Sequence, residues 1–77
     1  MRYKDYNLKG ITRTKIETVI DEYVIGFKAE RNRKLLKRRL CDGMTYEFIA
    51  EEMDMSVRQV KKISYVYESV ICEHLWE

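Results

Sequence analysis

The shortage of turn-forming residues is the feature that most limits what this chain can fold into. The sequence contains no proline, and its only glycines are Gly10, Gly26 and Gly43. An all-β fold of short strands needs many tight turns, which proline and glycine form more readily than most residues. A chain made mostly of helices needs few such turns. The sequence therefore predicts an all-α fold.

Length and composition set further bounds. The 77 residues fit one small domain, and a hydrophobic content of 45% is too high for intrinsic disorder. No apolar run approaches the ~20 residues of a membrane-spanning helix, and the first residues lack the apolar core of a secretory signal. We therefore expect a cytoplasmic protein with no membrane contact. Cys41 and Cys72 are too few for a disulfide framework, so we expect free thiols.

The stretch from Thr14 to Phe27 has the pattern of an amphipathic helix. Thr14 and Glu17 have the spacing of a Thr-x-x-Glu capping box, which predicts that the helix begins there. We expect Gly26 either to end this helix or to lie within a longer one. Residues 1–11 lack the helical period, so we expect an N-terminal arm followed by a single helical domain at 12–77. The apolar residues that define the inward side are Ile16, Val19, Ile20, Tyr23, Val24 and Phe27.

A second, strongly basic helix is expected at about residues 29–42. Gly43 is well placed as the first residue beyond its end. The basic groups have two explanations: a solvated face that suits the helix dipole, or a surface that contacts phosphates. The residues expected on the buried side are Leu35, Leu36, Leu40 and Cys41.

Residues 45–64 contain two short helical patterns separated by a turn. Thr45 is placed to cap the first helix, and Asp54 tolerates the positive φ that a brief turn requires. Ser56 and Gln59 form a Ser-x-x-Gln capping box that opens the second helix. The residues expected to face inward are Ile49, Ala50, Met53, Met55, Val57, Val60 and Ile63.

This arrangement resembles the helix-turn-helix, in which a small residue, here Ala50, lets the second helix pack closely on the first. Asp54 stands where many members have glycine. Over about residues 14–67 the pattern is similar to region four of bacterial sigma factors and to the C-terminal domain of quorum-sensing response regulators. The small sigma-like regulators of prophages are nearest in size. The resemblance implies a transcriptional regulator that binds double-stranded DNA through the second motif helix, without catalysis or cofactor.

The outward side of that second helix carries the candidate DNA-binding residues. Arg58 or Lys61 could address guanine, Gln59 an adenine edge, and Ser56 a phosphate near the helix N-terminus. Lys62 and Tyr65 are expected to hold the DNA backbone. On the second predicted helix, the basic run supplies further candidates for phosphate contacts. These are Arg31, Lys34 and Arg38.

An acidic segment lies between the two basic ones and supports an alternative function. Its carboxylates would repel phosphates if they faced DNA, so they are expected to face solvent or neighbouring cations. Such a surface could instead meet a protein. The alternative is a protein-interaction module of sigma-like fold that docks on RNA polymerase or another partner without reading DNA. The acidic residues are Glu47, Glu51, Glu52 and Asp54.

No helix-breaking residue follows Ser64, so the second motif helix is expected to run on to Leu75, for about 20 residues. The complete fold is then an all-α bundle of four to five helices that contains a helix-turn-helix with a long recognition helix. The apolar side of the extension packs either on the first helix or on a second copy of the chain, which would give a homodimer. That side contains Tyr67, Val70, Ile71 and Leu75.

The sequence contains few residues suited to metal binding or catalysis. Cys41, Cys72 and His74 supply at most three zinc ligands, whereas structural zinc sites almost always have four. No nucleophile, base and orienting acid can be assembled around His74, and no glycine-rich phosphate loop is present. We therefore expect no metal site, no cofactor and no enzymatic activity.

Overall fold

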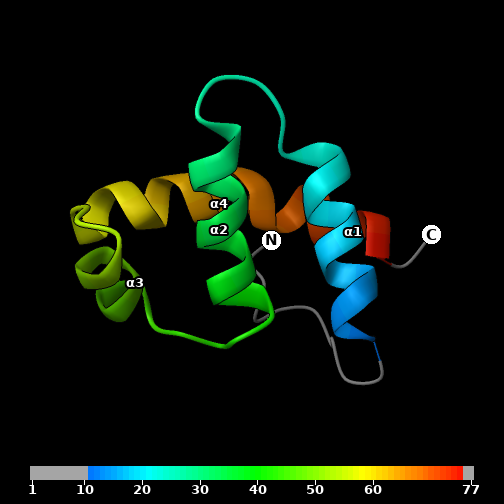
Figure 1. The fold of residues 1–77 in the computed structure, drawn as a ribbon, viewed down its shortest axis with the longest axis horizontal. Coiled ribbons are helices and arrows are strands. Elements are labelled where there is room, and N and C mark those ends of the chain that lie inside the picture. The colour runs from blue at the N-terminus through cyan, green and yellow to red at the C-terminus, as the bar shows by residue number, and fades with distance from the viewer. Residues whose placement is uncertain (1–10, 76–77) are drawn as a thin grey trace.

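The computed structural model describes residues 11–75, which form four helices and no strand. The helices are α1 (Arg13–Tyr23), α2 (Ala29–Leu40), α3 (Tyr46–Glu52) and α4 (Val57–Leu75). Helices α1 and α2 run in opposite directions in front of α4, and α3 lies beside the first turns of α4 (Figure 1). The all-α prediction is confirmed. Of the predicted arm, residues 1–10 lie outside the described part, and Ile11 packs against the core.

The core lies where the three shorter helices pack against α4. Helical spacing brings one side of each helix into it, and each fully buried Leu or Ile contributes roughly 1.5–3 kcal/mol relative to exposure. Met53 and Met55, which the sequence predicts to be inward, are half-buried against this cluster. The buried hydrophobic residues are Ile16, Val19, Ile20, Val24, Leu35, Leu36, Leu40, Ile49, Ala50, Val60, Ile71, Cys72 and Leu75.

The predicted start of the first helix is wrong, because the N-cap lies two residues earlier than predicted. Thr12, not Thr14, is the N-cap, and its hydroxyl accepts a hydrogen bond of 3.2 Å from the backbone N–H of Lys15. Thr14 lies inside the helix, where its carbonyl accepts a bond from the Thr18 hydroxyl. Because Ile11 packs against the core, the chain is already in position to enter the helix at Arg13.

The end of α1 also differs from the sequence-based pattern. The helix ends at Tyr23, and Val24 and Gly26 then turn the backbone away, with φ of +92° at Gly26. Residues beyond Val24 therefore leave the buried side. Phe27, predicted to be in the core, is 88% exposed, and Tyr23 is 38% exposed with its ring stacked on His74 at 3.8 Å.

Helix α2 begins at the predicted residue and ends two residues earlier than predicted. The last helical residue is Leu40 and the C-cap is Cys41, so Gly43 lies two residues farther from the helix end than predicted. Gly43 has φ of +69°, and the N–H of Met44 returns to the carbonyl of Arg38 at 3.1 Å. The left-handed glycine thus reverses the chain between α2 and α3.

The turn between α3 and α4 follows the sequence-based prediction closely. Thr45 caps α3 by accepting a bond of 3.1 Å from the N–H of Phe48. Asp54 has φ of +53°, and the N–H of Met55 donates to the carbonyl of Ala50 at 2.9 Å. Together with the longer bond from Asp54 to Glu51, this is a Schellman closure in which Asp54 takes the position that glycine usually holds.

Helix α4 has 19 residues, in agreement with the predicted extension. Within the chain, its second half packs on α1, and Ile71 and Leu75 are buried. Val70, also predicted to face inward, is 39% exposed. The intramolecular alternative therefore accounts for most of the apolar side of this extension, while the homodimer stays a prediction.

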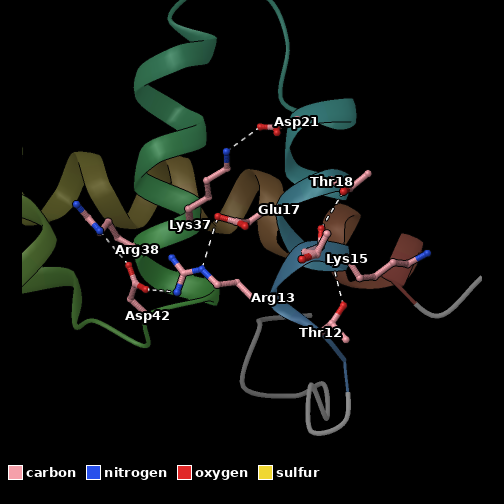
Figure 2. Close-up of polar contacts among 10 residues, drawn as sticks. Thr12, Arg13, Lys15, Glu17, Thr18, Asp21, Lys37, Arg38 and Asp42 are labelled. Atoms are coloured by element: carbon pink, nitrogen blue, oxygen red, sulfur yellow. Dashed lines mark hydrogen bonds and ion pairs between the residues drawn. The ribbon is translucent and has the colours of Figure 1, made fainter.

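Ion pairs join α1, α2 and the loop that follows α2 (Figure 2). The carboxylate of Asp42 accepts hydrogen bonds from Arg13 at 2.6 Å and from Arg38 at 3.1 Å. Lys37 pairs with Asp21 across the two helices at 3.0 Å. These contacts lie at the surface and fix the direction of the chain as it leaves α2.

The Asp42 contacts predict a pH-dependent contribution to stability. Hydrogen bonds from Arg13 and Arg38 hold the pKa of Asp42 below its usual value of 3.8. A carboxyl whose pKa is lowered by folding stabilises the protein above its unfolded pKa, and this contribution is lost as the pH falls through the folded pKa. Asp42→Asn should therefore lower the thermal midpoint slightly at pH 7, and the difference should shrink as the pH falls below 3.8 and through the lower pKa of the folded state. An equal difference at pH 7 and at acid pH would contradict this role.

Candidate nucleic-acid interface

The first turn of α4 is closed by the predicted capping box. The N–H of Gln59 donates to the Ser56 hydroxyl at 3.1 Å, and the N–H of Ser56 donates to the side-chain oxygen of Gln59 at 3.1 Å. Gln59 would need that oxygen free to read adenine through two hydrogen bonds. The two residues are exposed as predicted, but their side chains are engaged in holding the start of the helix.

Besides the two capping residues, four predicted residues lie together on one side of α4. Arg58 and Lys62 are exposed, Lys61 is half-buried, and Tyr65 is 40% exposed. They line an open hollow along the helix, which we call the α4 hollow. It contains three cations and no acidic side chain. Its lining residues are Val57, Arg58, Lys61, Lys62 and Tyr65.

An aromatic contact with α3 sets the position of one wall of the α4 hollow. The ring of Tyr65 meets the ring of Tyr46 edge-on, with centroids 6.0 Å apart and an interplanar angle of 88°. The ammonium of Lys61 lies 6.0 Å from the Tyr46 ring, and the guanidinium of Arg39 lies 4.2 Å from it. Tyr46 therefore connects α2, α3 and the exposed side of α4.

A buried carboxylate of α4 holds Tyr46 in turn. Glu68 is fully buried, accepts a bond of 3.2 Å from the Tyr46 hydroxyl, and is bonded to the Ser64 hydroxyl. The nitrogen Nε of Arg39 lies 3.7 Å from the same carboxylate. Burial, together with the charge of Glu68, raises the pKa of Tyr46, so the phenol stays protonated and donates to the carboxylate.

The three candidates on α2 lie apart from the α4 hollow. Lys34 and Arg38 line a different hollow, between α1 and α2, which also contains acidic residues of both helices. Arg38 is engaged by Asp42 and by Glu52, the latter at 2.9 Å. Arg31 donates two hydrogen bonds to Asn32. Of these three, Lys34 is the most open to solvent.

The acidic side chains of α3 do not line the α4 hollow. Glu52 pairs with Arg38 of α2, as expected for an acid beside a basic neighbour. Glu51 and Glu52 line a separate hollow with Phe48, whose side chain is 54% exposed. The helix thus presents an acidic and aromatic surface that is distinct from the basic side of α4.

The described cysteine and histidine side chains do not line the α4 hollow. Within residues 11–75, no three His, Cys, Asp or Glu side chains are grouped to hold a metal ion. Cys41 and Cys72 are free, as predicted, and burial raises the pKa of the Cys72 thiol to about 11. None of the four described helices is both long and apolar enough to cross a membrane.

Sequence reasoning missed two parts of this site. The sequence predicts Val57 only as an inward residue, although its spacing of four from Lys61 also places it in the α4 hollow. Glu68, which the sequence analysis does not single out, is fully buried. Its position relative to Ser64, Ile71 and Leu75 follows the buried stripe of α4, and this period could have identified it.

No family model, curated protein or solved structure matches this chain.

Proposed function

We propose that this protein is a sequence-specific DNA-binding transcriptional regulator that places the first turns of α4 in the major groove of a duplex. The observation that carries the proposal is the α4 hollow, where Arg58, Lys61 and Lys62 lie together with no acid among the lining residues. The opposite side of the same turns packs into the core through Val60. A helix held in this way can present its outward side to a groove wide enough to admit it.

The geometry favours distinct roles for the exposed residues. Arg58 is well placed to reach a guanine edge, because it is exposed in the first turn of α4 and is not one of the two residues of the capping box. Lys62 lies one turn later and suits a phosphate, as does Lys34 on α2 if the DNA extends across that helix. Ser56 and Gln59 stabilise the start of the helix in this scheme. The proposed role requires no catalysis, cofactor or metal.

Salt dependence tests the proposal. Each phosphate neutralised by Lys or Arg releases counterions, so log K for duplex binding should fall linearly with log[salt], with a slope of about −0.9 per contact. We expect a slope of about −2 to −4 for random-sequence duplexes, and tighter binding to duplexes selected from a random pool. Absence of binding at about 50 mM salt would reject the function.

The Phe48 surface of α3 favours a second candidate function. An exposed aromatic ring beside Glu51 and Glu52 suits a basic protein surface better than a phosphate backbone. RNA polymerase is the partner to test first. Purified polymerase should then bind the wild-type chain but not the Phe48→Ala variant. The wild type and the variant should bind duplex DNA equally weakly. Strong, salt-sensitive duplex binding that Phe48→Ala retains would favour the DNA-binding role instead.

A further inference from the structure

The α4 hollow has an apolar surface beneath its charges. Val57, Lys61 and Tyr65 follow one another at intervals of one helical turn, so their apolar parts form a continuous strip. Although three of the five lining residues are cationic, most of the exposed surface in the hollow is apolar. Phosphate binding uses the charged ends of lysine and arginine and gives this strip no role.

The walls of the strip are fixed by contacts outside it. The edge-on contact with Tyr46 limits the movement of the Tyr65 ring, and Tyr46 is itself bonded to the buried Glu68. The ammonium of Lys61 lies toward the Tyr46 ring, which leaves its methylene groups alongside the hollow. A recess with fixed walls loses little entropy when a small apolar group enters it.

Building on the proposed DNA-binding function, we propose that the α4 hollow receives the C5 methyl group of thymine. The flanking Arg58 and Lys62, with no acid in the lining, favour a polyanionic partner over an ordinary apolar peptide. Among the groups that bases present in the major groove of DNA, the thymine methyl is the apolar one. The Val57 methyls and the Tyr65 ring form the contact, while the neighbouring cations hold the backbone.

The proposal predicts a preference that depends on one methyl group. Deoxyuridine pairs like thymidine and lacks only the C5 methyl, so the comparison leaves charge and base pairing unchanged. Burial of one such group is worth about four-fold in affinity, which corresponds to about 0.8 kcal/mol. Replacing thymine by uracil at the contacted position should therefore weaken binding about four-fold, and 5-methylcytosine should bind more tightly than cytosine there.

The experiment uses the full chain and a duplex selected from a random pool. Each thymine of the selected duplex is replaced in turn by uracil, and the affinity of each duplex is measured at one salt concentration. We expect one or two positions to show the loss. Val57→Ala and Tyr65→Ala should each reduce the thymine preference to below about 1.5-fold, while both variants keep the salt slope and the helical circular dichroism of the wild type.

Three results would overturn the inference, and they are distinguishable from failure of the proposed function. Equal affinity for thymine-containing and uracil-containing duplexes at all positions, with a normal salt slope, would rule out the methyl contact but would still support DNA binding. A thymine preference that persists in both variants would show that the methyl group contacts a part of the protein other than the α4 hollow. If no duplex is bound and none is enriched by selection, both the inference and the proposed function fail.

Discussion

A variant carrying Arg58→Ala and Lys62→Ala is expected to bind its selected duplex at least about 30-fold more weakly than the wild-type protein. A bidentate guanine contact contributes about 1–3 kcal/mol, and a 30-fold loss corresponds to about 2 kcal/mol. Both side chains are exposed and lie outside the core, so the variant should fold normally. Loss of Lys62 should also reduce the magnitude of the salt slope by about 1.

The control for this prediction is a variant with the same change in net charge on another surface. Lys15 and Lys28 are exposed on α1 and in the loop before α2. Lys15→Ala with Lys28→Asn fits, because asparagine tolerates the left-handed backbone at position 28. We expect less than about a three-fold loss for this control. Similar losses in the two variants would show that net charge, not the side of α4, drives binding.

Replacement of Glu68 by alanine is expected to have the largest effect on stability of any single polar substitution considered in the protein. The carboxylate is fully buried and is bonded to the hydroxyls of Tyr46 and Ser64. Its removal leaves the largely buried Arg39 without this counter-charge and opens a cavity in the core. Breaking such a pair commonly costs about 3–5 kcal/mol, and we expect about 3 kcal/mol for Glu68→Ala by urea denaturation at pH 7.

Two further variants separate charge pairing from packing. Glu73→Ala removes an exposed carboxylate from the same helix and should change stability by less than about 0.5 kcal/mol. Glu68→Leu combined with Arg39→Met removes both charges and should recover part of the loss, because apolar groups of similar size can replace a buried ion pair. A loss below about 1 kcal/mol for Glu68→Ala would contradict the stabilising role of this network.

Much of the helical pattern follows from local features of the sequence. Thr45, Ser56 and Gln59 cap their helices as predicted because the interactions they make lie within three residues of each other. Asp54 adopts positive φ because the Schellman bonds and the packing of Met53 and Met55 against the core outweigh its small steric cost. The end of α1 could not be predicted in the same way. The position of Phe27 depends on where the helix stops, and an apolar period does not reveal that.

The sequence predicts which charged residues of the candidate site are exposed, but it does not predict which partners they contact. The exposed positions of Arg58 and Lys62 follow from the inward placement of Val60 on the same helix. The pairing of Arg38 with Asp42 and Glu52 depends on how α2 meets the loops around it, which is a tertiary property. Such pairing leaves Arg38 less able to hold a phosphate than the basic run suggests.

The position of the DNA on the protein is measured most directly by the change of backbone amide signals in a ¹⁵N-labelled sample titrated with the selected duplex. We predict that the largest changes fall at residues 56–65 and that intermolecular NOEs join Arg58 and Tyr65 to base edges, while α1 is little affected. Changes centred on α1 or on the Phe48 surface, with residues 56–65 unaffected at saturation, would contradict this prediction.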